Sequence, residues 1–542
     1  MVVRKRQAGS TKGGPDSSHP QTPMDADDRT PATYRIPPLP RWELAIYFVV
    51  WIAHVIAACY YAWVGTRDFR DVVWGGFFEP GLGGLRRDSS NYEWNIALRQ
   101  GLLMLPWLVA HALLYNASPL RNALGARVFD MLMLLLWLTI VVWVYSWYTL
   151  LICLLFAVAM LLVAQAGVAV LIWMLACALL ICMGLYANAY LSESVDMFLL
   201  YSSEVLIAYK LIQYISFCQY MVRVRDPLTC PPELPPPPYH RHSLPSQLYH
   251  LLCYAFYPPY SVSLIVPYPQ YLGQKATRPP LSARPLTPIL WLALRVFCWA
   301  VCCEAVLYFL YFNAMFSDFL LLRRVPLPVL AAVGYLAGQY FQVKYMFIFG
   351  LPTLFARLDG MDPPWPPICI SRVALYSNMW RYFDRGLYAF LKQEIFVPLA
   401  APHFTTFSKL VGTVACFGFV WLWHTPTYSY LVWILLNLLE IYLESVGKWL
   451  YRQPWFQRSA PGRLSAPAFR RLVAASHVPC VALGIFSIWF FLGPPGTGMV
   501  FVWRFVFTEL PKLQFNAFHV LFLGYCYAQC CLQFQLWERE DE

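Results

Sequence analysis

The feature that most constrains this chain is the length of its uncharged runs. Met131–Leu191 contains no Asp, Glu, Lys or Arg, and the same holds for Leu44–Gly65 and Leu410–Leu439. A helix needs about 20 mostly apolar residues to cross a bilayer, so the longest run has room for two or three crossings. Soluble domains carry about 25% charged residues, whereas this chain has 13%. The chain is therefore predicted to be an all-α polytopic membrane protein.

Apolar segments recur along most of the chain, and we expect roughly ten to twelve transmembrane helices with some re-entrant segments. Residues 1–41 are polar and predict a disordered tail, residues 42–535 form the membrane domain, and 536–542 form a short charged tail. The candidate spans lie near 42–65, 99–115, 128–148, 149–165, 168–191, 196–222, 248–266, 288–316, 326–349, 407–434, 434–450, 471–493 and 512–535.

Charge and cysteine content exclude several function classes. The net charge of +11 is spread over many loops, which is typical of contact with a membrane surface and not of nucleic-acid binding. The 16 cysteines fall mostly inside apolar segments, where a thiol behaves as a small hydrophobe. No C-x-x-C pair is present, so nothing suggests a zinc ribbon or a disulfide framework.

Two proline-rich stretches interrupt the apolar pattern. The loop 223–247 contains PPELPPPPYHRH, which predicts an extended connector. A second run, DPPWPPIC at 362–369, predicts irregular chain between about 351 and 371. No internal repeat is visible in the sequence, which argues against a transporter built from inverted repeats.

Two ionisable residues stand out as candidates for chemistry. His424 lies in a run of thirty residues that is otherwise free of charge, and an ionisable group inside a span is a functional hypothesis by default. Thr425-Pro426 follows it and should kink the helix. Asp384 lies between Arg381 and Arg385. A purely structural interpretation stays open for both residues: His424 as a neutral histidine in the core, and Asp384 as part of a solvated ion cluster near the headgroups.

These residues carry a family resemblance. A lone histidine in an apolar run, with a carboxylate 40 positions upstream, resembles the membrane-bound O-acyltransferase (MBOAT) superfamily. The segments MWRYFD at 379–384, VKYMFIFGLP at 343–352, ARLDG at 356–360 and WH at 423–424 resemble its Hedgehog acyltransferase branch. The similarity is most specific over about 335–450, which we take as the catalytic core.

The resemblance implies an activity and a set of site residues. The branch moves palmitate from palmitoyl-CoA to the N-terminal cysteine amine of secreted Hedgehog proteins, in the endoplasmic reticulum membrane, with the Golgi as a second compartment. Carried over, Asp384 and His424 become the catalytic pair, and Trp380 and Arg381 line the acyl-CoA path. Cys369 corresponds to a position thought to bind haem iron through a thiolate. EGF-like proteins with an N-terminal cysteine are conceivable further acceptors.

The chain departs from its relatives at two places. Relatives often follow the histidine with glycine, whereas this chain has Thr425-Pro426. Many also carry a Gly-Pro pair in an upstream aromatic segment, where this chain reads SLIVP at 263–267. Neither departure removes a catalytic group.

Arg381, Arg385 and Lys392 suit the phosphates of CoA by their charge, and Asp384 or His424 would serve as general base. Three alternatives remain open: acylation of a serine or a lipid, a transporter with a proton relay, and a non-catalytic membrane regulator.

Overall fold

The structure is a computed structural model of the chain, and it describes residues 36–69, 77–190, 197–225, 243–373, 375–459, 462–512 and 515–541. The predicted disordered tail therefore lies outside the described residues up to position 35, as does most of the predicted proline-rich connector. Residues 36–40 are described, and Ile36 and Leu39 are buried there at 4% and 7% exposure. The end of the predicted tail thus includes two buried apolar side chains.

The fold is a bundle of helices, as predicted. Within the described ranges, nine helices are long and apolar enough to cross a membrane. They are α1 (Arg41–Asp68), α2 (Tyr92–Tyr115), α4 (Ala126–Val144), α5 (Trp147–Ala164), α7 (Met197–Arg225), α10 (Leu286–Phe309), α18 (Thr406–Trp423), α19 (Tyr428–Arg452) and α21 (Ala466–Leu492). Nine is close to the ten to twelve expected, and α6 (Ala169–Tyr190), α13 (Leu327–Ile348) and α23 (Phe515–Asp541) are also long.

Shorter elements connect the long helices. The one sheet in the described part pairs two three-residue strands in antiparallel register. The short elements are β1 (Phe78–Pro80), β2 (Arg86–Asp88), α3 (Ser118–Leu124), α8 (Leu244–Ala255), α9 (Tyr268–Ala276), α11 (Phe312–Ser317), α12 (Phe319–Leu322), α14 (Gly350–Leu358), α15 (Tyr376–Tyr382), α16 (Arg385–Leu391), α17 (Val397–Ala400), α20 (Pro454–Ser459) and α22 (Thr497–Val502).

Three expected boundaries are wrong, and proline explains two of them. The candidate span 248–266 is not one helix, because α8 ends at Ala255 and Pro258-Pro259 force a 3₁₀ turn. The break expected near residue 434 falls instead at His424–Thr427, where Pro426 separates α18 from α19. The stretch expected to be irregular from 351 begins with helix α14 and is irregular only over 361–369.

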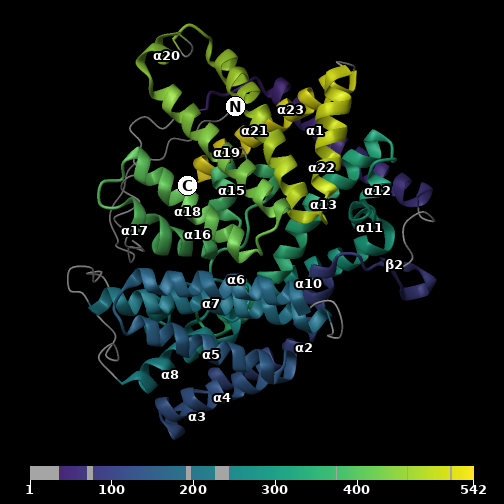
Figure 1. The fold of residues 1–542 in the computed structure, drawn as a ribbon. Helices are drawn as coiled ribbons and strands as arrows, with labels where there is room; N and C mark the ends of the chain where they lie inside the picture. Colours follow the sequence, from purple (N-terminus) through teal and green to yellow (C-terminus); the bar gives the residue numbers. More distant parts are fainter. Residues whose placement is uncertain are drawn as a thin grey trace, which may run out of the picture.

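The helices form two groups that meet at the core (Figure 1). Helices α4 to α7 lie across the lower half of the view, and α15, α16, α18, α19 and α21 lie above them. Side chains from α4 to α8 join others from α16, α18 and α19 in one large buried cluster. Because α13 and α23 pack against α21, and α1 packs against both α13 and α23, residues far apart in sequence surround the interior of the upper group.

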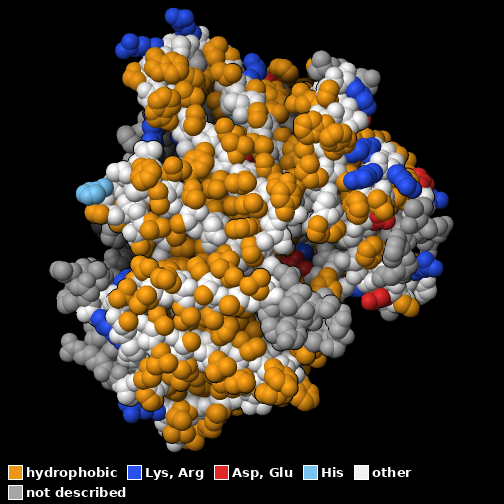
Figure 2. Space-filling model, in the orientation of Figure 1, with side chains coloured by type: hydrophobic (Ala, Val, Ile, Leu, Met, Phe, Trp, Pro, Cys, Tyr) orange, Lys and Arg blue, Asp and Glu red, His pale blue; other side chains and the backbone are white. Residues whose placement is uncertain are grey.

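The outer surface has the character expected for contact with lipid. Figure 2 shows hydrophobic side chains over broad bands of the visible face, with Lys and Arg gathered mainly near its edges. In α1, only 6% of the apolar window is buried inside the protein, although this window has the high mean hydropathy of a span. Such exposure is unfavourable in water, so the bilayer is the solvent that fits this surface.

Candidate active site

A cavity of about 790 Å³ with a mostly apolar lining lies among these helices. Its walls come from α1, α13, α15, α16, α19, α21 and α23 and from the turn between α18 and α19. His424, Asp384 and Trp380 all line it. Binding pockets typically combine an apolar lining with a few convergent polar groups. The structure thus brings three of the five predicted site residues into one chamber.

His424 occupies the break between two membrane helices. α18 ends at Trp423, the His424 N–H donates to the Val420 carbonyl at 3.0 Å, and α19 begins four residues later. The imidazole lies among the rings of Trp423, Tyr430, Trp433 and Phe491, with centroids 4.8 to 5.9 Å away. Within the described part of the chain, no hydrogen bond reaches its ring nitrogens, so both remain available to a substrate in the cavity.

The turn after His424 contains a strained residue. Thr425 has φ of +70°, a left-handed conformation that is an outlier for a β-branched side chain. Ser263, in the segment SLIVP, also has a positive φ of +73°. Strain of this kind costs about 1–3 kcal/mol and gathers at functional sites. The backbone at His424 is therefore held in shape by its surroundings.

We expect Thr425→Gly to raise the apparent Tm of the detergent-solubilised protein or leave it unchanged. Glycine removes the left-handed strain, worth about 1–2 kcal/mol, and loses about 0.5–1 kcal/mol to greater freedom of the unfolded chain. Thr425→Val keeps β-branching and should not raise the Tm. Thermal unfolding of both variants measures this, and a clear fall in the Tm of Thr425→Gly would contradict the strain assignment.

Asp384 serves a structural purpose as well as facing the cavity. It is the N-cap of α16, and its Oδ1 accepts a hydrogen bond from the Leu387 N–H at 2.9 Å. Asp384 lies outside the candidate membrane-spanning helices. Removal from bulk water raises its pKa to about 6, against the opposing pull of the Leu387 and Gly386 N–H groups. A carboxyl with this pKa is ionised at neutral pH yet basic enough to accept a proton.

The two residues predicted as a catalytic pair do not contact each other directly. Both line the same cavity, but no hydrogen bond or ion pair among the described residues joins Asp384 to His424. A substrate large enough to fill this cavity can therefore meet both groups, each from a different part of the lining.

Trp380 connects the Asp384 segment to α19. Its Nε1–H donates to Asn437 Oδ1 at 2.9 Å, and its ring stacks on Trp433 with centroids 5.7 Å apart. Asn437 also lines the cavity and is fully buried. Sequence reasoning missed Asn437, although an amide inside the apolar run LVWILLNLL was a visible signal. Trp433 contacts His424 in turn, so one aromatic chain links Trp380 to the imidazole.

Sequence reasoning also missed Glu440, one helical turn beyond Asn437. It lines the cavity and is only 1% exposed. The charge-free run that singled out His424 ends at residue 439. Glu440 is the next residue, so it was taken as the end of the run and not as part of the site. Asn437 and Glu440 are three residues apart, and residues with this spacing lie on the same face of a helix.

Arg381 does not line the cavity; its guanidinium lies near the rings of Tyr382 and Tyr388, with distances of 5.9 and 5.8 Å to the centroids. Arg385 likewise lies over Tyr382, at 4.8 Å. Neither arginine nor Lys392 is among the lining residues. The predicted contact of Arg381 with the acyl-CoA path therefore needs a part of the ligand that extends beyond this chamber.

Cys369 stands just before a 3₁₀ turn at Ile370–Arg372 and is a partly exposed free thiol. Its neighbours Ile370 and Ser371 line the cavity, whereas Cys369 itself does not. No cluster of three or more metal-binding side chains occurs in the described part of the chain. A thiolate haem site needs only one protein ligand, so haem ligation by Cys369 stays a prediction, tested by absorption in the Soret region.

Comparison with known proteins agrees with this geometry. The model of the membrane-bound O-acyltransferase family matches residues 214–488, just over half of the chain. The matched region contains Asp384, His424 and most walls of the cavity.

Individual relatives extend the similarity. The mouse protein named protein-cysteine N-palmitoyltransferase HHAT is 27% identical over 513 residues, which cover 90% of this chain and 97% of the mouse protein. The Drosophila melanogaster protein-cysteine N-palmitoyltransferase Rasp is 32% identical over 239 residues, or 44% of this chain and 47% of the fly protein. The Saccharomyces cerevisiae membrane-bound O-acyltransferase GUP1 is 24% identical over 272 residues, 47% of this chain and 44% of the yeast protein.

Proposed function

Because this chain belongs to the membrane-bound O-acyltransferase family, and is thus an acyltransferase, we propose that it transfers palmitate from palmitoyl-CoA to the N-terminal cysteine amine of secreted Hedgehog-type proteins. The observation that carries the proposal is the single apolar cavity that presents both His424 and Asp384. The names of the mouse and fly relatives support the choice of donor and of acceptor residue.

The cavity suits the donor's acyl chain. Each buried CH₂ of an acyl chain contributes about 0.8 kcal/mol to binding. Burial of the palmitoyl chain in this apolar cavity would therefore supply most of the free energy with which the tail binds. The rings around His424 exclude water from the thioester, which disfavours hydrolysis of palmitoyl-CoA. We assign the phosphates of CoA to the cationic side chains Arg381, Arg385 and Lys392 outside the chamber.

The acceptor must lose a proton before and during attack. An α-amine has a pKa of about 7.7–8.0 and is largely an ammonium at neutral pH. Once the first proton has left to solvent, the amine nitrogen attacks the thioester carbon and its second proton passes to Asp384. His424 donates a hydrogen bond to the carbonyl oxygen as negative charge develops there. The C–S bond then breaks, and the departing thiolate of CoA takes the proton from Asp384.

Several further assignments belong to the same proposal. The catalytic core is taken as about 335–450 within a membrane domain of 42–535. The acceptor is secreted, so the proposed compartment is the endoplasmic reticulum membrane, with the Golgi as the second. EGF-like proteins that begin with cysteine would be accepted on the same chemical grounds, because the reacting group is the terminal amine.

Acceptor competition tests the proposal. Purified protein is given palmitoyl-CoA with equal amounts of a Hedgehog N-terminal peptide beginning with cysteine and a matched peptide beginning with serine. We expect acylation of the cysteine peptide by at least about tenfold over the serine peptide, and none of an N-acetylated cysteine peptide. Preferred acylation of the serine hydroxyl would point to an O-acyltransferase and contradict the assigned acceptor.

A further inference from the structure

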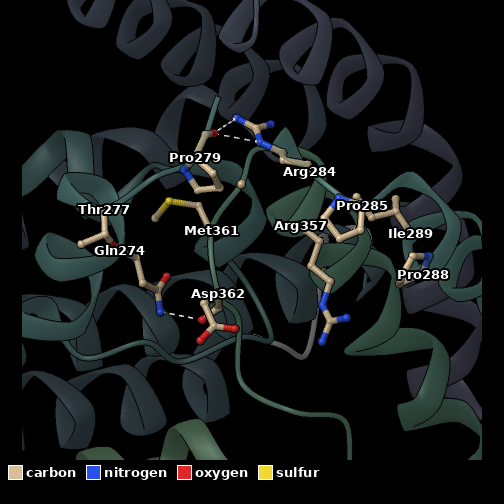
Figure 3. Close-up of a pocket in the computed structure, with 11 residues that line it drawn as sticks. Gln274, Thr277, Pro279, Arg284, Pro285, Pro288, Ile289, Arg357, Met361 and Asp362 are labelled. Carbon is tan, nitrogen blue, oxygen red and sulfur yellow. Dashed lines mark hydrogen bonds between the residues drawn. The ribbon is translucent and has the colours of Figure 1, made fainter. Parts of the chain in front are cut away.

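A second pocket, of about 370 Å³, lies away from the acyl-transfer cavity and shares no lining residue with it. It is formed where the end of α9, the start of α10 and the end of α14 meet (Figure 3). Gln274 and Thr277 lie on one side, and Pro288 and Ile289 of α10 lie on the other. The pocket is open, so a surface ligand can reach it.

Two opposite charges line this pocket without pairing. Arg357 is half-buried against Trp365, with 5.6 Å from its guanidinium carbon to the ring centroid. In the described part of the chain no hydrogen bond engages that guanidinium. Asp362 is exposed, and Gln274 donates to its main-chain oxygen at 2.6 Å, which leaves the carboxylate unbonded by described residues.

Arg284 forms the wall rather than a binding group. Its guanidinium donates to the Pro279 carbonyl, to Asn116 Oδ1 at 2.7 Å and to the Leu358 carbonyl. Figure 3 shows the first of these contacts directed away from Asp362. Arg357 is therefore the cation in this pocket that can engage a ligand.

The pocket lies at the end of a membrane helix. α10 begins at Leu286, beside the pocket, and is a candidate span. Leu290, Leu294 and Phe297 form one outward stripe along it, with exposures of 68%, 49% and 65%. Trp365 is 66% exposed, and tryptophan is enriched where membranes meet water. The pocket thus stands at headgroup level above a lipid-facing stripe.

We propose that this pocket binds a phospholipid headgroup with a primary amine, of the phosphoethanolamine class. The phosphate oxygens accept hydrogen bonds from Arg357, the ammonium donates to Asp362, and the acyl chains follow the outward stripe of α10. Guanidinium is the side chain best suited to bidentate phosphate binding. An anionic headgroup without an ammonium gives the Asp362 carboxylate no cation to pair with, and a trimethylated amine has no N–H to donate to it.

Native mass spectrometry of the purified full chain with defined lipids tests this site. We expect phosphatidylethanolamine to be retained about fivefold better than phosphatidylcholine or phosphatidylglycerol. Arg357→Gln should lower this retention, and Asp362→Asn should remove the preference for the primary amine. Arg323→Gln is a matched control, because Arg323 also lies over a ring, that of Phe319 at 5.4 Å, but outside the pocket. It should change nothing.

The phosphates of CoA are an alternative ligand for Arg357, because they would accept the same hydrogen bonds as a lipid phosphate. A rise in the KM for palmitoyl-CoA in Arg357→Gln, with phosphatidylethanolamine retention unchanged, would assign the pocket to the donor and overturn the lipid proposal. Equal lipid retention in wild type and both pocket variants would overturn it too. If Arg357→Gln has a lowered Tm, Arg357→Lys keeps the charge and must retain the lipid for the proposal to stand.

Discussion

We expect His424→Ala to lower palmitoyl transfer at least about 100-fold, because loss of a positioned proton-handling group typically costs 10²–10⁴ in rate. The imidazole packs against four aromatic rings and makes no hydrogen bond with the described residues, so its loss should leave the fold intact. Transfer to a cysteine peptide, measured beside the Tm in detergent, separates the two effects. Activity within tenfold of wild type would show that His424 does not act on the reacting atoms.

Asp384 allows a sharper comparison, because its carboxylate both caps α16 and faces the cavity. Asp384→Asn keeps a good N-cap and removes the base, whereas Asp384→Ala removes both and should cost about 0.5–2 kcal/mol of stability. We expect both variants to lose palmitoyl transfer and only the alanine variant to lose stability. Full activity in Asp384→Asn would reduce Asp384 to a capping residue.

The second large effect is expected at Lys210, which is 0% exposed on helix α7. Its ammonium donates to the Ala255 carbonyl, to the Ser261 carbonyl at 2.9 Å and to Ser261 Oγ at 2.7 Å. It thereby holds the turn after α8 against α7. Lys210→Met preserves length but leaves these acceptors buried without a donor, at about 1–3 kcal/mol each.

The Tm of Lys210→Met in detergent should therefore fall by on the order of 5 °C or more. Lys275→Met is the matched control, since Lys275 pairs with Asp130 at 3.3 Å but its side chain is 34% exposed. Such a pair contributes about 0–1 kcal/mol, so its loss should barely shift the Tm. Equal Tm values for the two variants would show that Lys210 is not needed to hold the turn.

Hydropathy predicted the helical membrane fold because the bilayer leaves few other solutions for uncharged runs as long as Met131–Leu191. Helix ends were harder to predict. Thr425-Pro426 predicted a kink beside His424. Hydropathy alone placed the boundary between the two helices near residue 434, because the sequence Tyr428–Leu439 is apolar before and after that residue and marks no helix end. The segment 248–266 read as one span because its tyrosines and prolines count as apolar although Pro258-Pro259 end the helix.

The site could be predicted only as a set of residues. The spacing of Asp384 and His424 along the chain says nothing of their separation in space, which depends on how α16, α18 and α19 pack. The chamber also needs walls from α1, α13, α21 and α23, and no local pattern predicts those. The amide of Asn437 and the carboxylate of Glu440 are visible in the sequence, but only the packing of α19 shows that both residues line the cavity.

The most direct test of the central claim is the chemical linkage of the product. Wild-type protein is incubated with palmitoyl-CoA and a peptide with a free N-terminal cysteine, and the product is treated with hydroxylamine before tandem mass spectrometry. We expect one palmitoyl group on the terminal nitrogen, as an amide that hydroxylamine does not remove. A product that carries palmitate only as a hydroxylamine-sensitive thioester, or release of free palmitate with no acylated peptide, would contradict it.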